Sequence, residues 1–178
     1  MNTIDFKVTV GKSGQSGRKR WLDPGIFIDG QPFCASYPID LDELYDSMKE
    51  DGEFHIFTCS CGDPGCNRLD DGIQVSTGND CVSWKVFDYY FVGDIGERWR
   101  LSGEDDKPAH VYTFDRAQYV ERLTKFFEEA KAICRKFPTI GISPHGYSPK
   151  LLLRVAEGSE TRLQWRHDHA VRTGQPTV

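Results

Sequence analysis

The 178-residue sequence has no long hydrophobic run, since no stretch approaches the roughly 20 apolar residues of a membrane-spanning helix. Its first ten residues, MNTIDFKVTV, lack a basic start followed by an apolar core, so we expect no signal peptide. An excess of basic residues is also missing, because the net charge is −5. This charge disfavours a nucleic-acid-binding surface. Together these absences predict a cytoplasmic protein with neither a membrane nor a nucleic-acid partner.

The short motifs of common enzyme classes are missing as well. A glycine five residues before Gly11-Lys-Ser would complete a P-loop, but Phe6 stands there. We find no serine-centred nucleophile elbow and no dinucleotide-binding glycine fingerprint. We therefore expect a non-enzymatic protein with no required cofactor. A cysteine nucleophile paired with a distant histidine stays open, as do roles for His145, His167 and His169.

Length and composition fit one globular domain, which we place at residues 1–178. Apolar residues alternate with polar ones or cluster between turn signals, which predicts several strands. Asp29-Gly30 is a strong signal for a hairpin turn. We also interpret the aromatic, glycine-punctuated segment 89–99 as a strand. The expected strands are residues 4–10, 21–28, 54–57, 73–75, 82–87, 89–99 and 111–114.

Two helices have clear start signals. Asp40 is placed to cap the first, with Glu43 completing a capping box and Gly52 lying just past its end. Asp115 and Gln118 repeat this pattern at the second helix. Apolar residues then recur at spacings of three and four up to a proline, which predicts a long helix packed against a sheet.

These elements predict an α+β fold. An antiparallel, twisted sheet built from hairpins is packed by one long helix, and a second, short helix accompanies it. Cys134 lies on the apolar face of the long helix and is expected to be a small core residue. For residues 148–170 the pattern fits either a helix or a strand, and both stay open.

Six cysteines in a chain without a secretion signal favour reduced thiols or a metal site over a disulfide scaffold. Three of them share a glycine-rich turn, and the four residues between Cys61 and Cys66 match the ligand spacing of zinc sites. The usual redox-active dithiol, Cys-x-x-Cys at a helix start, is not what this turn contains. The alternative to a metal is a set of buried or half-buried thiols in an architectural turn. The candidate zinc ligands are Cys59, Cys61, Cys66 and Cys81, with His55 and His110 in reserve.

Acidic residues gather at the first helix and in two loops. Most such runs are helix caps or solvated faces. A second interpretation is a surface that steers a basic partner, such as a nuclease whose cleft is masked. The candidate partner-binding residues are Asp42, Glu43, Asp46, Glu50, Asp70, Asp71, Glu104, Asp105 and Asp106.

Three segments carry a resemblance: the turn Phe57-Thr-Cys-Ser-Cys-Gly-Asp-Pro-Gly-Cys66, the strand containing Val82 and Trp84, and the run from Tyr112 to Tyr119. They resemble a group of small, mostly uncharacterised bacterial proteins. Small acidic proteins of this kind are similar to immunity proteins that neutralise polymorphic or contact-dependent toxins. The resemblance implies a non-enzymatic inhibitor of a basic toxin and transfers no catalytic residue.

The alternative function is a small zinc-binding protein. Four cysteine ligands would close the site and make it structural, whereas three ligands and a water would permit hydrolysis.

Overall fold

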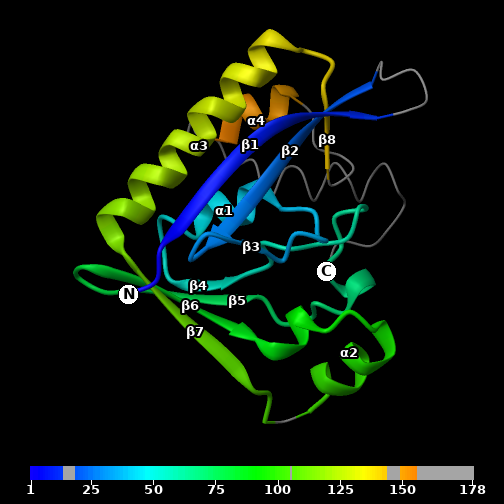
Figure 1. Ribbon diagram of the computed structural model, residues 1–178, viewed down its shortest axis with the longest axis vertical. Coiled ribbons are helices and arrows are strands. Elements are labelled where there is room, and N and C mark those ends of the chain that lie inside the picture. The colour runs from blue at the N-terminus through cyan, green and yellow to red at the C-terminus, as the bar shows by residue number, and fades with distance from the viewer. Residues whose placement is uncertain (14–18, 105, 144–148, 156–178) are drawn as a thin grey trace.

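The computed structural model describes residues 1–13, 19–104, 106–143 and 149–155. Within these ranges the chain forms two four-stranded sheets with helices packed around them (Figure 1). The predicted α+β class, the hairpins and the long helix are confirmed. The strands divide between two sheets, whereas the sequence pattern predicts one.

The first sheet is built on a long hairpin. Strands β1 (Ile4–Ser13) and β2 (Lys19–Ile28) are antiparallel, and β3 (Gln31–Phe33) continues the meander on the other side of β2. The two residues of the Asp29-Gly30 turn both have positive φ, 51° and 77°, as a two-residue hairpin turn requires. The short β8 (Gly141–Ile142) pairs with β2 in parallel, which is the one departure from the expected antiparallel pattern among the described strands.

The second sheet is antiparallel throughout, in the order β4-β5-β6-β7. Its strands are β4 (Gly52–Phe54), β5 (Ile73–Thr77), β6 (Cys81–Phe87) and β7 (Ala109–Asp115). The hairpin predicted from residues 73–87 is therefore present.

Helix α3 (Arg116–Lys136) begins where the sequence predicts. The Asp115 carboxylate accepts the N–H of Gln118 at 2.8 Å and so satisfies one free donor of the first turn. Cys134 is buried at 1% exposure, so its predicted place in the core is confirmed.

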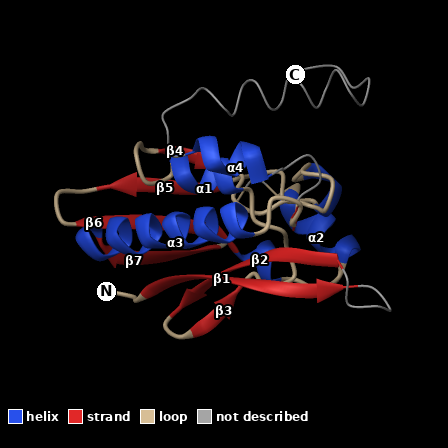
Figure 2. Ribbon diagram, turned by 90° about the horizontal axis from the view of Figure 1, so that it is seen from above, coloured by secondary structure: helices blue, strands red, loops and turns tan. Residues whose placement is uncertain are grey.

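Tyr119 of α3 joins the two sheets. Its ring lies 5.8 Å from the ring of Phe6 on β1 and 6.0 Å from that of Trp84 on β6. Its hydroxyl is 2.9 Å from the hydroxyl of Ser47, the residue after helix α1 (Leu41–Asp46). The buried apolar side chains of both sheets form one cluster, with α3 running alongside β1 and over the second sheet (Figure 2).

Helix α1 (Leu41–Asp46) is shorter than predicted, because Ser47 ends it. The Ser47 hydroxyl donates to the Leu44 carbonyl at 2.7 Å, and such a local bond competes with continued helix. Gly52, which we had placed just past the helix, instead begins β4.

The cap of α1 also differs from the prediction. The Asp40 side chain accepts the N–H groups of Asp42 and Glu43, both at 3.1 Å, so its capping role is confirmed. The N–H of Asp40 donates to the Ile56 carbonyl at 2.8 Å. The Glu43 carboxylate instead accepts the N–H of His55 at 3.1 Å. The predicted reciprocal capping box is therefore wrong.

The strand predicted at 89–99 is wrong. A 3₁₀ turn, η2 (Asp88–Phe91), leads into helix α2 (Ile95–Ser102). Asp94 caps α2 by accepting the N–H of Glu97 at 2.8 Å. This Asp-x-x-Glu start signal outweighs the strand preference of the aromatic residues before it.

Helix α4 (Pro149–Val155) supports the helical alternative for the beginning of residues 148–170. The remainder of that segment lies outside the described residues. No helix in the described ranges is both long and apolar enough to cross a bilayer.

Candidate functional site

The cysteine turn starts from a segment that leaves the second sheet after Phe54. Only part of the strand predicted at 54–57 forms, because the chain pairs instead with the segment before α1. Ile56 accepts the N–H of Asp40, and Thr58 donates its N–H to the Pro38 carbonyl at 3.0 Å. These bonds hold the next residue, Cys59, against the core at 8% exposure.

The turn closes through its own polar groups. Gly62 has a φ of 90° and donates its N–H to the Cys59 carbonyl at 3.0 Å. The Asp63 carboxylate accepts the N–H of Gly65 at 2.8 Å, which opens the 3₁₀ turn η1 (Gly65–Asn67). The side-chain amide of Asn67 then donates to the Thr58 carbonyl at 3.2 Å and ties the end of the turn to its start.

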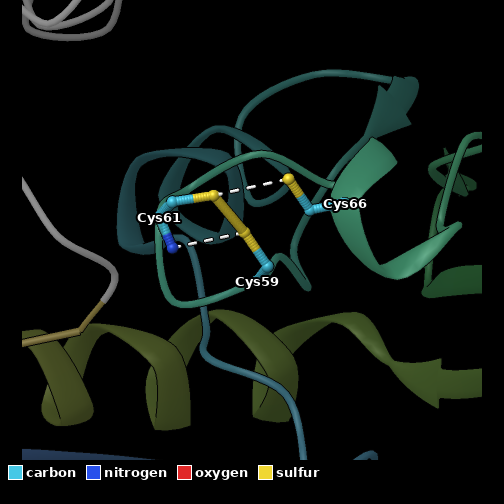
Figure 3. A group of neighbouring side chains, drawn as sticks. All are labelled: Cys59, Cys61 and Cys66. Atoms are coloured by element: carbon cyan, nitrogen blue, oxygen red, sulfur yellow. Dashed lines mark hydrogen bonds between the residues drawn. A yellow bond between two sulfur atoms is a disulfide. The ribbon is translucent and has the colours of Figure 1, made fainter. Parts of the chain in front are cut away.

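Three sulfur atoms converge inside this turn (Figure 3). The Sγ atoms of Cys59, Cys61 and Cys66 all lie within 4.8 Å of one another. Cys59 and Cys61 are joined in a disulfide, with their Cα atoms 5.4 Å apart. The Sγ of Cys66 is 3.6 Å from that of Cys61 and belongs to a free thiol. The arrangement is one disulfide with a third sulfur in contact with it.

Polar groups surround the sulfurs on both sides. The N–H of Cys61 donates to the Sγ of Cys59 at 3.2 Å, and the thiol of Cys66 donates to the Asp63 carboxylate at 3.7 Å. Desolvation, followed by the negative charge of Asp63, raises the pKa of the Cys66 thiol. Burial and the Asp63 carboxylate thus both favour the thiol form of Cys66, whereas the nearby charge of Arg68 opposes them.

The structure brings together three of the four predicted ligands. Cys81 lies at the start of β6, beyond the far end of the five-residue β5. At about 3.4 Å per residue, β5 alone is about 17 Å long, which separates Cys81 from the turn. His110 lies on β7, where its Nε2 is 3.5 Å from an Asp88 oxygen. His55 follows β4 and is half-buried, and it does not belong to the sulfur group.

The disulfide itself differs from our expectation of reduced thiols. Residues two apart in this tight turn bring their sulfurs within bonding distance, which strand geometry alone did not suggest. His145, His167 and His169 lie outside the described residues.

A buried arginine connects helix α2 to the cysteine turn. Arg98 is 6% exposed, and its guanidinium donates to the Asn67 carbonyl at 2.7 Å. Two further bonds reach the Val92 carbonyl, at 2.8 and 3.1 Å. The guanidinium of Arg68, the residue after η1, stacks over the Trp99 ring at 4.1 Å. The turn and α2 are therefore neighbours held by two arginines.

The outer side of α2 exposes an apolar row, which sequence reasoning missed. Ile95 and Trp99 of α2 are four residues apart, so they lie on one face of the helix, and they are 54% and 56% exposed. Phe91, which ends the 3₁₀ turn η2 before the helix, is 46% exposed. Recognition of the Asp94 cap would have revealed the helix and, with it, the exposed pair Ile95 and Trp99. We call the three residues the α2 apolar row.

The predicted acidic residues divide into two groups. At α1, Asp42 and Glu43 are only 4% and 1% exposed, so they are not available to a partner surface. Asp46 bonds Lys49 at 3.0 Å, and Glu50 is exposed.

The acidic loops, by contrast, come together beside α2. Lys107 bonds the Asp71 carboxylate at 2.6 Å and so joins the loop at 70–71 to the loop that follows α2. Asp70 and Asp106 are exposed, whereas Glu104 pairs with Arg100. Asp105 lies outside the described residues.

A groove of about 820 Å³ lies between β1 and α3. Arg122 of α3 reaches its strand wall and donates to the Ile4 carbonyl at 2.6 Å. Its lining carries three acidic and three basic side chains and neither cysteine nor histidine, so it offers no catalytic cluster among the described residues.

Comparison with protein-family models, with curated proteins and with solved structures finds no match to this chain. Its function is therefore inferred from the geometry of its own residues.

Proposed function

We propose that the cysteine turn is a zinc-binding thiol centre when its disulfide is reduced. The observation that supports this proposal is the convergence of the Cys59, Cys61 and Cys66 sulfurs within 4.8 Å. Thiolate sulfurs bind Zn²⁺ at about 2.3 Å in a tetrahedral arrangement, so sulfurs on one ion lie about 4 Å apart. Small side-chain rotations in the reduced turn would supply that spacing.

Three cysteine ligands leave one tetrahedral position open. Cys61 and Cys66 are exposed, so this position faces solvent and would take a water molecule or a group from a partner. A zinc-bound water is the form that supports hydrolysis, whereas a fourth protein ligand would make the centre structural. The positive ion would also offset the effect of Asp63 on Cys66, because metal binding displaces the thiol protons.

The test uses protein purified without an affinity metal, then reduced and dialysed against stoichiometric zinc. We expect about one zinc per chain by elemental analysis and three thiols that react only after chelation. Cys66→Ser should lose the zinc, and Cys81→Ser should keep it as the matched control. Unchanged zinc content in Cys66→Ser, or none in the unaltered protein, contradicts the proposal.

We propose a second function for the neighbouring surface: binding a basic protein, as an immunity-type inhibitor does. The observation in its favour is the α2 apolar row, with exposed Asp70 and Asp106 on the adjoining loops. Exposed aromatic residues ringed by charge are typical of protein interfaces. The acidic rim would attract a basic partner and reject an acidic one.

Affinity capture with the tagged protein tests this second function. A basic partner should be recovered by the unaltered chain and by Gln74→Ala, a substitution at an exposed site on β5. Trp99→Ala should lose at least tenfold in affinity, as central aromatic anchors do. Equal capture of the partner by Trp99→Ala and by the unaltered chain counts against this function. A reproducible turnover activity without any protein partner does so as well.

A further inference from the structure

We propose that the cysteine turn carries out an internal thiol–disulfide exchange, in which the Cys66 sulfur displaces the Cys59 sulfur from its disulfide with Cys61. The geometry that supports this is the 3.6 Å separation between the Cys66 and Cys61 sulfurs. Reacting atoms in a near-attack arrangement are about 3–3.5 Å apart and aligned with the bond that breaks. All three sulfurs lie within 4.8 Å of one another, so the Cys66 sulfur lies to the side of the disulfide, and its side chain must rotate to come into line with the Cys59–Cys61 bond. Figure 3 shows the Cys66 sulfur beside the disulfide, with a dashed line to the Cys61 sulfur.

The step balances within the turn. The Cys66 sulfur attacks the Cys61 sulfur, the Cys61–Cys66 bond forms, and the Cys59–Cys61 bond breaks. Cys59 leaves with the electron pair. The proton of Cys66 passes by way of the Asp63 carboxylate, its hydrogen-bond acceptor, and Cys59 finally takes up one proton. One disulfide and one thiol exist before and after, so no external oxidant or reductant is needed.

The turn also contains a group that favours the departure of Cys59. The N–H of Cys61 already donates to the Cys59 sulfur at 3.2 Å. A hydrogen bond to a leaving thiolate stabilises its developing negative charge. Attacking thiol, central sulfur and stabilised leaving group are thus all supplied by eight residues of one turn.

The exchange changes where the disulfide is accessible. Before the step the bond includes Cys59, which is only 8% exposed. After it the bond joins Cys61 and Cys66, which are both exposed, so a small thiol in solution can attack either sulfur of the bond rather than Cys61 alone. This activity belongs to the oxidised turn and does not depend on zinc, which requires the reduced turn.

The experiment locates the free thiols of the oxidised protein. Of six cysteines, two form the disulfide and four are free, so Cys34, Cys81 and Cys134 serve as internal references. Metal-free protein is incubated near neutral pH, quenched in acid, unfolded and alkylated, and the label at each cysteine is read by peptide mass spectrometry. Acid quenching stops exchange because it removes thiolate.

If exchange occurs, one label per chain is shared between Cys59 and Cys66, while the three references are fully labelled. Label on Cys66 alone, unchanged over hours of incubation, overturns the proposal. Cys59→Ser provides an independent check, because mild oxidation should then join Cys61 to Cys66. Recovery of both as free thiols in folded Cys59→Ser also overturns it. Zinc retention by the reduced protein is measured separately, so failure of either proposal is distinguishable from failure of the other.

Discussion

Helix α1 and the surface around α2 both carry carboxylates close together in the sequence, but they use them differently. At α1 the side chains of Asp40 and Glu43 bond backbone N–H groups and are buried at 6% and 1% exposure. Around α2, Asp70 and Asp106 face solvent beside exposed apolar residues. The same residue type is structural in one region and accessible to a partner in the other.

Local hydrogen-bonding demand explains the difference. A helix start and the segment crossing it leave several N–H groups without intrahelical acceptors, and α1 meets that demand with carboxylates. In the loops beside α2, Asp71 is engaged by Lys107 and by the Tyr89 hydroxyl at 2.8 Å, and Glu104 pairs with Arg100, whereas Asp70 and Asp106 are exposed. Acidic runs next to helix starts therefore overstate the available acidic surface.

The largest expected effect comes from Glu43→Ala. It removes a buried carboxylate that accepts the N–H of His55 at a part-buried site, so the free energy of unfolding should fall by about 3 kcal/mol. Urea unfolding measures this value. Glu50→Ala, at an exposed position after the same helix, should change it by less than about 0.5 kcal/mol. Equal losses of unfolding free energy in the two variants would contradict a structural role that is limited to the buried carboxylate.

Asp40→Ala should lower the free energy of unfolding by about 1.5 kcal/mol, because it removes the cap of α1. Asp40→Asn keeps an acceptor oxygen and should recover most of the loss. Thermal unfolding followed by circular dichroism compares the two variants. A loss as large in Asn as in Ala would indicate that charge, rather than capping, is what the site requires.

The cysteines should show the same division between buried and exposed groups. Burial raises the pKa of Cys34 to about 12, whereas Cys66 is exposed. In the reduced protein at pH 8 we expect Cys66 to alkylate at least tenfold faster than Cys34. Because thiolate is the reactive form, the Cys34 rate should keep rising about tenfold per pH unit up to pH 10. Comparable rates at pH 8 would show that Cys34 is accessible.

The smallest expected effect is a difference in stability between variants of two adjacent residues beside α2, Asp70 and Asp71. Asp71→Asn weakens the bond to Lys107 and should cost about 1 kcal/mol, since that pair is only partly exposed. Asp70→Asn should leave stability within about 0.3 kcal/mol and reduce only the binding of a basic partner. Chemical denaturation and partner capture, run on both variants, sharpen the distinction between structural and accessible carboxylates.

Regular local patterns made much of the fold predictable. The Asp115 cap and the spacing of apolar residues predicted α3 almost to the residue, and Asp29-Gly30 predicted its hairpin. Both depend on interactions within a few residues. The division into two sheets depends on long-range contacts such as those of Tyr119, which no local pattern contains.

The candidate site was predictable only in part, for the same reason. Turn residues indicated that Cys59, Cys61 and Cys66 would converge. The position of Cys81 depends on the direction in which β5 leaves the turn, and that direction follows from pairing with β4. The α2 apolar row is not predicted, because the aromatic content of residues 89–99 favours a strand, whereas the Asp94 cap starts a helix there.

The Arg98 side chain has a consequence for local unfolding. The Arg98 guanidinium donates hydrogen bonds to the carbonyls of Asn67, Val92 and Gly93. Separating α2 from the cysteine turn would therefore leave this buried charge without its Asn67 acceptor. The two segments should therefore open as a single cooperative unit. Amide hydrogens of η1 and α2 should then exchange with one shared opening free energy, and reduction of the disulfide should lower it in both segments together.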